Sequence, residues 1–457
     1  MSGTIEQMFA NLWNRAMHRG PVEHDDGLGL GLIVHDGQLT RRTFRISDRK
    51  RTEHVGILGK TGTGKSSLLR HMCQQDIRRD TGFIYFDLHG DTVPFLLSTI
   101  ADEEMRRGQY LHEKVIVIEP GDPDFSIGLN VLDNAKGERA FMQIAEFAQV
   151  LRQRWHLELG PRTEELLRNS LHVLADNDLT LLELAPLLTN GTYRVSCLRR
   201  VANPDVKQFF ELRYNQASEA MQGVLRDAIL NKVSTFTSDP RFRHILGQTQ
   251  STFSLQDAID QGRWVLVNLD KGRLGEQSLT LGSLLLTKIK SALFARTQRS
   301  LFVLYCDEVQ NLVAFDSGLE TLLSEARKFG ASVVTANQFL DQHSPVMKAA
   351  LLAIGTHAFF QLSSLDAEKL TAALDGGRTL AQLLKNLPAR NTVVKLGGAH
   401  WRQVAVPSVR RAERSFAELY ARCRLRWARK RSAVEQEIRK RHALANKSSN
   451  EVLNDWE

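Results

Sequence analysis

The stretch Gly59-Lys60-Thr61-Gly62-Thr63-Gly64-Lys65-Ser66 decides the fold of this chain. It has the GxxxxGK[ST] spacing of a P-loop, and it lies between an apolar run, Val55–Leu58, and a helical pattern, Ser67–Met72. Glycines let the backbone curl so that successive N–H groups point at phosphate oxygens, and the following helix adds its positive N-terminal end. A chance glycine-rich turn would lack this context, so the sequence predicts a phosphate-binding loop.

The chemistry of this loop indicates its ligand. Lys65 would neutralise charge on the β- and γ-phosphates, and the hydroxyl of Ser66 would coordinate Mg²⁺. ATP and Mg²⁺ are therefore the expected cofactors. The predicted nucleotide-binding residues of the loop are Gly59, Lys60, Thr61, Gly62, Thr63, Gly64, Lys65, Ser66 and Ser67.

A second motif lies far downstream. The apolar run Phe302–Cys306 ends in Asp307 and Glu308, the arrangement of a Walker B strand. In a doubly wound sheet, a carboxylate at the carboxyl end of such a strand lies beside the P-loop. Asp307 is the expected Mg²⁺ ligand, and Glu308 is expected to orient and deprotonate the attacking water. The acidic pair alone would also fit a helix N-cap, but with a P-loop it predicts nucleotide hydrolysis.

A third apolar run, Ser332–Thr335, leads into Asn337 and Gln338. A polar side chain at the tip of a neighbouring strand can contact the γ-phosphate or the attacking water. We assign this sensor role to Gln338, with a helix-capping polar pair as the alternative.

Short apolar runs alternate with helical stretches along the chain. Such runs are typical of strands buried on both faces, and their alternation with helices predicts a mostly parallel, doubly wound α/β sheet. The runs are Val55–Leu58, Phe83–Phe86, Val115–Ile118, Val265–Leu269, Phe302–Cys306, Ser332–Thr335 and Ala358–Gln361. Residues 136–230 show only helical patterns, namely Ala140–Leu151, Glu164–Leu174 and Ala217–Leu230, which predicts an inserted all-α domain.

Two features precede the P-loop. Thr4 to Met17 has the spacing of an amphipathic helix, which would pack on the body of the protein or, alternatively, dock a partner. Gly27 to Gly31 resembles a dinucleotide fingerprint but lacks its final glycine and a following helical pattern, so it indicates a glycine-rich turn or strand.

The formal charge of +8 is concentrated at the C-terminus. From Arg410 to the end there are thirteen Lys/Arg against seven Asp/Glu, a net +6. A basic balance favours nucleic acid first and an acidic membrane second. Within this tail, Phe416, Tyr420, Cys423 and Trp427 lie on one face of a predicted helix.

Cysteine usage and hydropathy indicate the compartment. The cysteines form no CxxC pair, which fits a reducing cytosol without a metal site or disulfide framework. There is no secretory signal, and no run approaches the roughly 18 apolar residues of a membrane span. We therefore expect a cytoplasmic protein without direct membrane insertion, with any membrane association through a partner.

Several segments resemble the HerA/FtsK superfamily of DNA-pumping ATPases, and most of all its TraG/TraD-type conjugative coupling proteins of type IV secretion. The resemblance covers roughly Gly29 to Val406. The segments are Asp87–Asp91, Ile127–Leu132, Asp307–Asn311, Ser324–Gly330 and Ala336–Gln338. Of these, Ser324–Gly330 together with Ala336–Gln338 is much more specific than the P-loop.

The resemblance implies a RecA-like motor domain with an inserted all-α domain, assembled as a homo-hexameric ring around DNA. The predicted domains are an N-terminal part (1–50), the motor domain (51–135 and 231–406), the insertion (136–230) and a basic helical tail (407–457), of which the tail is not part of the family's core pattern. Arg327 matches the position that reaches the neighbouring subunit's nucleotide, where a guanidinium can stabilise charge on a transferring phosphoryl group. A surface ion pair, with Glu325 or an acid of the next helix, is the alternative. Asp87 is implied to lie close to the nucleotide.

The expected function is an ATP-driven DNA translocase, with a relaxase or secretion-channel protein as a further partner. The alternatives are an ATP-controlled recruitment adaptor and a secretion ATPase for protein substrates. Unlike the membrane-anchored coupling proteins, this sequence shows no transmembrane pattern, so mobilisation, repair or phage defence are alternatives to conjugation. Candidate DNA-binding residues are Lys232, Arg241 and Arg243, and in the tail Arg422, Arg424, Arg426, Arg429 and Arg431, with solvated surface as the alternative for each.

Overall fold

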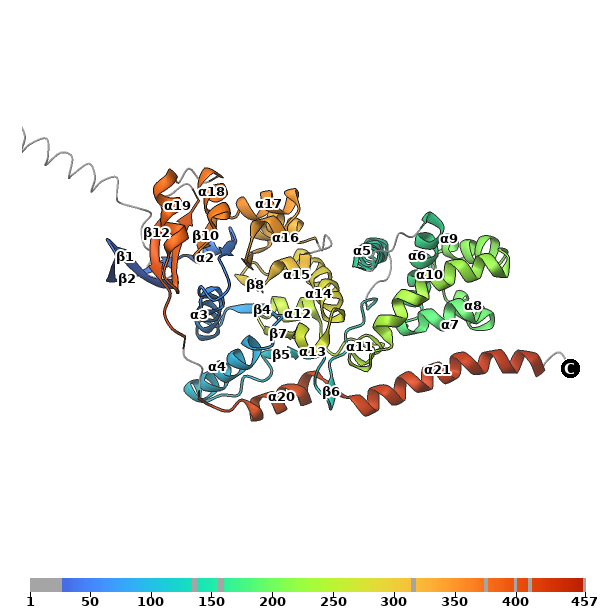
Figure 1. Ribbon diagram of the computed structural model, residues 1–457. Coiled ribbons are helices and arrows are strands. Elements are labelled where there is room, and N and C mark those ends of the chain that lie inside the picture. The colour runs from blue at the N-terminus through green and yellow to red at the C-terminus, as the bar shows by residue number, and fades with distance from the viewer. Residues whose placement is uncertain are drawn as a thin grey trace, which may run out of the picture. The chain divides into compact units, whose positions relative to one another are not determined.

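The computed structural model describes residues 27–133, 138–154, 160–313, 318–373, 377–397, 401–409 and 413–454 (Figure 1). The helix predicted over Thr4–Met17 lies outside these residues. The chain forms two compact units. The first comprises Met1–Phe83, Gln298–Gln310 and Glu320–Ala412, and the second Ile84–Thr297, Asn311–Leu319 and Glu413–Glu457.

The first unit is built on a mixed sheet. Its strands run in the order β2-β1-β12-β11-β10-β3-β9-β8. The neighbours β10, β3, β9 and β8 are parallel, whereas β11, β12, β1 and β2 extend the sheet in antiparallel fashion. The bounds are β1 (Leu28–His35), β2 (Gln38–Ile46), β3 (Val55–Leu58), β8 (Phe302–Cys306), β9 (Ala331–Asn337), β10 (Thr356–Phe359), β11 (Asn391–Leu396) and β12 (Arg402–Ala405).

The register of the parallel strands brings the predicted motifs to one edge of the sheet. Leu58, the last residue of β3, pairs with Asn337 of β9 and Phe359 of β10. Cys306, the last residue of β8, pairs with Thr335 of β9. The loops that follow β3, β8, β9 and β10 therefore start side by side, as the parallel arrangement predicts.

The helices of the first unit connect these strands. The helix α3 (Lys65–Arg78) directly follows the P-loop and buries Leu68, Leu69 and Met72. The other helices, in chain order, are α2 (Asp48–Arg51), α16 (Leu319–Glu325), η3 (Ala326–Phe329), η4 (Leu340–Gln342), α17 (Pro345–Leu352), α18 (Ser364–Ala373) and α19 (Gly377–Asn386). Helix α15 (Val309–Val313) starts in the first unit and ends in the second.

The second unit contains the strands β4 (Gly82–Asp87), β7 (Trp264–Asn268) and β5 (Val115–Ile118), in that order, with β5 and β7 parallel. A short antiparallel pair joins β6 (Phe125–Ser126) to β13 (Arg429–Lys430). Helices α4 (Thr92–Arg107), α13 (Lys271–Leu274) and α14 (Gln277–Phe294) belong to the same unit. Together, the two units confirm the prediction of a mostly parallel central sheet with helices between its strands.

The described residues between β6 and β7 form helices and no strand (Figure 1). Helix α10 continues past Leu230, the predicted end of the insertion, and the boundaries of an inserted domain stay a prediction. The helices are α5 (Glu138–Arg154), α6 (Pro161–Asp176), η1 (Leu181–Glu183), α7 (Leu184–Thr189), α8 (Gly191–Leu198), α9 (Pro204–Gln208), the π-helix η2 (Phe209–Tyr214), α10 (Glu219–Thr237), α11 (Pro240–Leu246) and α12 (Leu255–Asp260).

Six of the seven apolar runs predicted from the sequence coincide with strands to within a residue or two, whereas the run Ala358–Gln361 was placed too late, because β10 ends at Phe359. The strand at Gly27–Gly31 is β1, where the backbone explains one glycine: Gly31 has φ +153°, and a Cβ there would lie 2.2 Å from the carbonyl oxygen of Ala405. The antiparallel strands β11 and β12 were not predicted individually. Their ends are half-buried, so they lack the continuous apolar character of the parallel strands.

Candidate nucleotide-binding and hydrolysis site

The P-loop has a backbone shape that favours anion binding. Gly62 and Gly64 have φ of +78° and +119°, values that side chains with a Cβ rarely adopt. Gly64 precedes the first residue of α3 and has no side chain that could cap the helix. The N–H groups of the first turn of α3 therefore have no capping side chain at this position and can bind a phosphate group.

Lys65 is buried, and its ammonium group points back to the loop. Its Nζ donates hydrogen bonds to the carbonyl oxygens of Gly59 (2.7 Å) and Lys60 (3.0 Å). Burial lowers the pKa of Lys65, while the nearby carboxylates of Asp307 and Glu308 oppose this shift. A bound phosphate would add negative charge beside this ammonium group and stabilise its protonated form.

The two motifs, distant in sequence, meet at Ser66 and Asp307. The hydroxyl of Ser66 donates a hydrogen bond of 3.4 Å to Oδ2 of Asp307, and Asp307 is buried. A hydroxyl and a carboxylate on one side, next to a phosphate-binding loop, are the oxygen ligands that Mg²⁺ prefers. These residues fit the predicted metal site.

Glu308 is linked to the P-loop through Gln338. The side-chain amide of Gln338 donates to Oε1 of Glu308 (2.8 Å) and accepts from the hydroxyl of Thr61 (3.1 Å). The backbone of Glu308 has φ +50°, a left-handed value, and its N–H donates to Oδ1 of Asp307 (3.0 Å). Such strained conformations concentrate at functional sites because the surrounding structure must hold them.

A buried polar cluster joins the P-loop helix to the Walker B strand. Arg51 donates to both carboxylate oxygens of Asp76 at 2.7 Å, and the Tyr305 hydroxyl donates to the same carboxylate at 2.5 Å. All three side chains are fully buried. Asp76 lies on α3, as does Ser66, and Tyr305 lies on β8 two residues before Asp307. This cluster therefore fixes α3 against β8, the two elements that carry Ser66 and Asp307.

Arg327 has a different partner from either acid suggested by the sequence. Its guanidinium lies 3.4 Å from Oε1 of Glu53, and its side chain is 54% exposed. The pair is a contact within the chain at an open position. Contact with the nucleotide of a neighbouring subunit stays a prediction.

The carboxylate of Asp87 forms hydrogen bonds within the loop that follows β4. It accepts the backbone N–H groups of His89, Gly90, Thr92 and Val93 at 2.8–3.1 Å, which anchors the start of α4. Burial raises the pKa of Asp87, and these N–H groups oppose that shift. Asp87 belongs to the second unit, and its predicted contact with the nucleotide stays a prediction.

Two residues at the P-loop were missed from the sequence. The N–H of Arg390 donates to the carbonyl of Thr63 (2.7 Å), and Phe360 packs against the positions of Gly59 and Gly64. Phe360 directly follows β10, so the end of that strand could have indicated it. Arg390 follows Pro388 and Ala389, and that segment gives only a turn signal.

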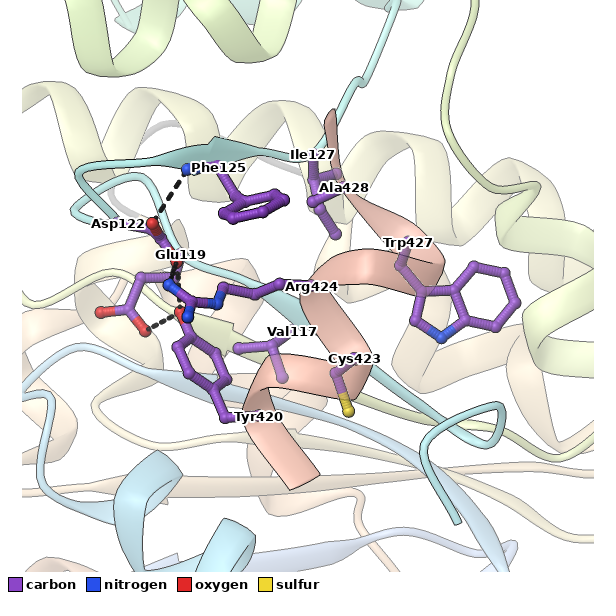
Figure 2. A pocket seen from close by; sticks show the side chains of 10 residues that line it. All are labelled: Val117, Glu119, Asp122, Phe125, Ile127, Tyr420, Cys423, Arg424, Trp427 and Ala428. Carbon is purple, nitrogen blue, oxygen red and sulfur yellow. Dashed lines mark hydrogen bonds and ion pairs between the residues drawn. The ribbon is translucent and has the colours of Figure 1, made fainter. Parts of the chain in front are cut away.

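The basic tail folds onto the second unit, where α20 (Ala417–Trp427) packs on β5 and α21 (Arg431–Asn454) on α8 (Figure 1). Figure 2 shows the pocket between α20 and the end of β5. There the hydroxyl of Tyr420 lies 2.9 Å from Asp122 and 3.2 Å from Glu119, and Arg424 lies 3.3 Å from Asp122. Burial raises the pKa of both Glu119 and Tyr420.

The tail arginines proposed as DNA contacts each have a partner within the unit. The pairs are Arg422 with Glu104, Arg424 with Asp122, Arg426 with Glu113, Arg429 with Glu437, and Arg431 with the carbonyl of Pro120. Net charge alone did not reveal these partners, because all of the acids except Glu437 lie far away in sequence. The tail arginines are thus tied to the protein's own carboxylates and carbonyls.

Two of the other candidates are also engaged. Arg241 pairs with Asp239 (2.6 Å) and donates to the carbonyl of Arg273, and Arg243 lies 3.7 Å from Glu435. These contacts occupy both guanidinium groups within the second unit.

The sheet, the P-loop and the acidic pair at the end of a neighbouring parallel strand define a P-loop ATPase with a RecA-like fold. The chain belongs to the family of the HerA helicase central domain, because the model of that domain matches residues 38–289, more than half of the chain.

Solved structures share this fold. The bacterial conjugative coupling protein TrwB, in the form TrwBdeltaN70, superposes with a TM-score of 0.58 at 17% identity, over 84% of this chain and 90% of that one. TrwB in complex with ADP and Mg²⁺ gives 0.58 at 18% identity, over 85% and 96%. VirB4 of Thermoanaerobacter pseudethanolicus gives 0.57 at 15% identity, over 85% and 98%.

No curated protein sequence matches the chain. Among the helices that the structure describes, none combines the length and the apolar character needed to cross a bilayer.

Proposed function

We propose that this protein hydrolyses ATP with Mg²⁺ and uses the energy to move DNA through a homo-hexameric ring. The observation that carries the proposal is the meeting of Ser66 and Asp307 at 3.4 Å, with Glu308 beside them. A simple nucleotide-binding protein needs the P-loop and the metal ligand, whereas an adjacent glutamate provides a base for hydrolysis.

The comparisons support the choice of cofactor and substrate. TrwB, which has the same fold, has been solved with ADP and Mg²⁺ and with non-hydrolysable GTP and ATP analogues. The family name is that of a helicase, and TrwB is a conjugative coupling protein. We extend these properties to this chain as a proposal, together with a relaxase or channel protein as its further partner.

The residues of the site have distinct roles in the proposed reaction. The backbone of residues 59–66 and the ammonium group of Lys65 hold the triphosphate, and Ser66 and Asp307 hold Mg²⁺, which neutralises phosphate charge when bound. Glu308 accepts the proton of the water that attacks the γ-phosphorus as the bond to the β-phosphate oxygen breaks. Gln338, already bonded to Glu308 and Thr61, positions this carboxylate relative to the P-loop.

Arg327 would act between subunits of the ring. Its side chain is half exposed and paired with Glu53 at 3.4 Å, a weak contact that a neighbouring nucleotide could replace. Supplied from the adjacent subunit, its guanidinium would stabilise charge on the transferring phosphoryl group and make hydrolysis depend on assembly.

The test is the ATPase rate of the purified protein with and without DNA, at low and high salt, together with its mass in solution. We expect DNA to stimulate hydrolysis, salt to weaken the stimulation steeply, and Arg327→Ala to lose turnover without losing ATP binding. Unchanged turnover in Arg327→Ala would remove the role between subunits. An ATPase that ignores DNA but responds to a protein partner would instead indicate the recruitment adaptor or the secretion ATPase.

A further inference from the structure

The turn that carries Arg390 closes one side of the P-loop. A Cβ placed at Gly64 would lie 3.0 Å from Cα and 3.3 Å from Cγ of Arg390, and 3.1 Å from the ring of Phe360. The first carbons of the Arg390 side chain therefore lie against the residue that precedes Lys65. Gly64 has to be a glycine for this approach, in addition to its positive φ.

The backbone of Arg390 is held in an unfavourable conformation from both sides. Its φ is +61°, in the left-handed region, which costs an arginine about 1 kcal/mol or more relative to glycine. Its N–H donates to the carbonyl of Thr63 (2.7 Å), and its carbonyl accepts from the N–H of Val406 (2.8 Å). A glycine would adopt this turn without strain, so the arginine side chain has no role in forming it.

Arg390 is an exposed residue. Among the residues that the structure describes, no hydrogen bond or ion pair engages it. Arg51 and Arg327, by contrast, are paired with Asp76 and Glu53. Arg390 thus combines a strained, fixed backbone beside the P-loop with a charged group that no described carboxylate neutralises.

We propose that Arg390 is a further nucleotide-binding residue, whose guanidinium contacts the phosphate tail of the nucleotide held by the P-loop of the same chain. This inference rests on the proposed function, since it needs a nucleotide at residues 59–66. Thr63 and Gly64, the residues that Arg390 contacts, belong to the part of the loop whose N–H groups surround the phosphates. A planar guanidinium with five donors is well suited to bind phosphate oxygens in pairs.

The test compares Arg390→Gly with the wild type by titration calorimetry, using ATP and inorganic tripolyphosphate as probes, each with Mg²⁺. Glycine keeps the positive φ, so the variant loses the guanidinium without straining the turn. We expect roughly 10- to 100-fold weaker binding of both probes, the range for a lost charge-assisted hydrogen bond. Arg390→Lys, which keeps a charge but not the planar fork, should bind with intermediate affinity.

Arg378→Ala, which removes an exposed arginine of α19 in the same unit, controls for net charge and should bind as the wild type does. The proposal is overturned if Arg390→Gly binds both probes with wild-type affinity, or if it loses affinity for ATP but not for tripolyphosphate, which would indicate contact with the base or ribose. A wild type that binds neither probe would contradict the proposed function itself. Wild-type binding with an unaffected Arg390→Gly would contradict only the role of Arg390.

Discussion

The P-loop region and the C-terminal tail both contain charged residues that the sequence marks as candidate binding residues. In the structure, the charged groups of the two regions have different kinds of partner. At the P-loop, Lys65 points to backbone carbonyls, and Ser66 meets Asp307 where a metal would bind. In the tail, Arg422 and Arg424 pair with Glu104 and Asp122 of the second unit. The first arrangement is open to a ligand, and the second holds a helix in place.

This difference shows that a motif with defined spacing predicts a binding site better than the number of charged residues in a segment does. The P-loop spacing specifies a backbone shape and a set of neighbours, so its meaning does not depend on distant parts of the chain. A run of arginines specifies only charge, and its role depends on which acids the fold brings to it. Most pairs of this kind at the surface contribute little to stability, whereas removal of one partner from a buried pair is destabilising because it leaves the other charge buried and unpaired.

The largest expected effect on stability comes from the buried cluster of Arg51, Asp76 and Tyr305, which joins α3 to β8. Asp76→Ala leaves Arg51 buried without its carboxylate partner, which should lower the free energy of unfolding by about 3–5 kcal/mol. Urea denaturation measures this loss. Arg426→Ala in the tail is the matched control, because its pair with Glu113 is 3.7 Å long and largely exposed, and it should cost at most about 1 kcal/mol. Equal losses in the two variants would contradict the contrast between the regions.

A smaller effect is expected where the tail meets the helices of the second unit. Arg441 donates to the buried carboxylate of Glu183 (3.1 Å) and to the carbonyl of Gly247. Arg441→Ala should therefore lower the free energy of unfolding by about 2–3 kcal/mol. Arg439→Ala, whose partner Glu435 is bound at an exposed position, should change it by less than about 1 kcal/mol. DNA should stimulate the ATPase equally in both variants. If the stimulation were lost in Arg441→Ala alone, the tail would again be a candidate DNA-binding segment.

The nucleotide-binding unit should also lose stability in acid through His54. Burial lowers the pKa of His54 from 6.5 to about 4, and its Nδ1 accepts the N–H of Val333. Between these pH values the unfolded chain takes up a proton that the folded chain does not, so stability is present above pH 6.5 and lost as the pH falls toward 4. The expected loss between pH 7 and pH 5 is about 2 kcal/mol.

Urea denaturation of the wild type and of His54→Asn at both pH values measures this contribution. Asparagine tolerates the positive φ of position 54, +69°, and does not titrate in this range. The variant should show a correspondingly smaller loss of stability between pH 7 and pH 5. The same pH dependence in both proteins would show that His54 is not the titrating group.

The smallest expected effect concerns the link between Thr61 and Gln338. Thr61→Val removes one hydrogen bond to the amide that holds Glu308, worth about 1 kcal/mol, so the rate of hydrolysis at saturating ATP should fall roughly fivefold. The affinity for ATP should change less than the rate. If affinity fell while the rate stayed constant, Thr61 would act on the nucleotide itself and not through Gln338.

Much of the fold was predictable because each buried parallel strand is a continuous apolar run. That pattern predicts that Leu58, Cys306 and Asn337 lie at the same edge of the sheet. It therefore also predicts that the P-loop and Asp307 lie close together. The intrachain partner of Arg327, Glu53, and the approach of Arg390 to Gly64 could not be predicted. Both depend on tertiary packing between segments distant in sequence, and neither leaves a periodic signal.

The most direct test of whether residues 59–66 and 307–308 form one hydrolytic site uses two variants, Glu308→Gln and Lys65→Ala. For each variant, the rate of ATP hydrolysis and the affinity for ATP are measured. We expect Glu308→Gln to bind ATP with near wild-type affinity and to hydrolyse it about 100- to 10,000-fold more slowly, and Lys65→Ala to lose binding. Wild-type turnover in Glu308→Gln would show that the glutamate beside the metal ligand is not the base and would contradict the proposed mechanism.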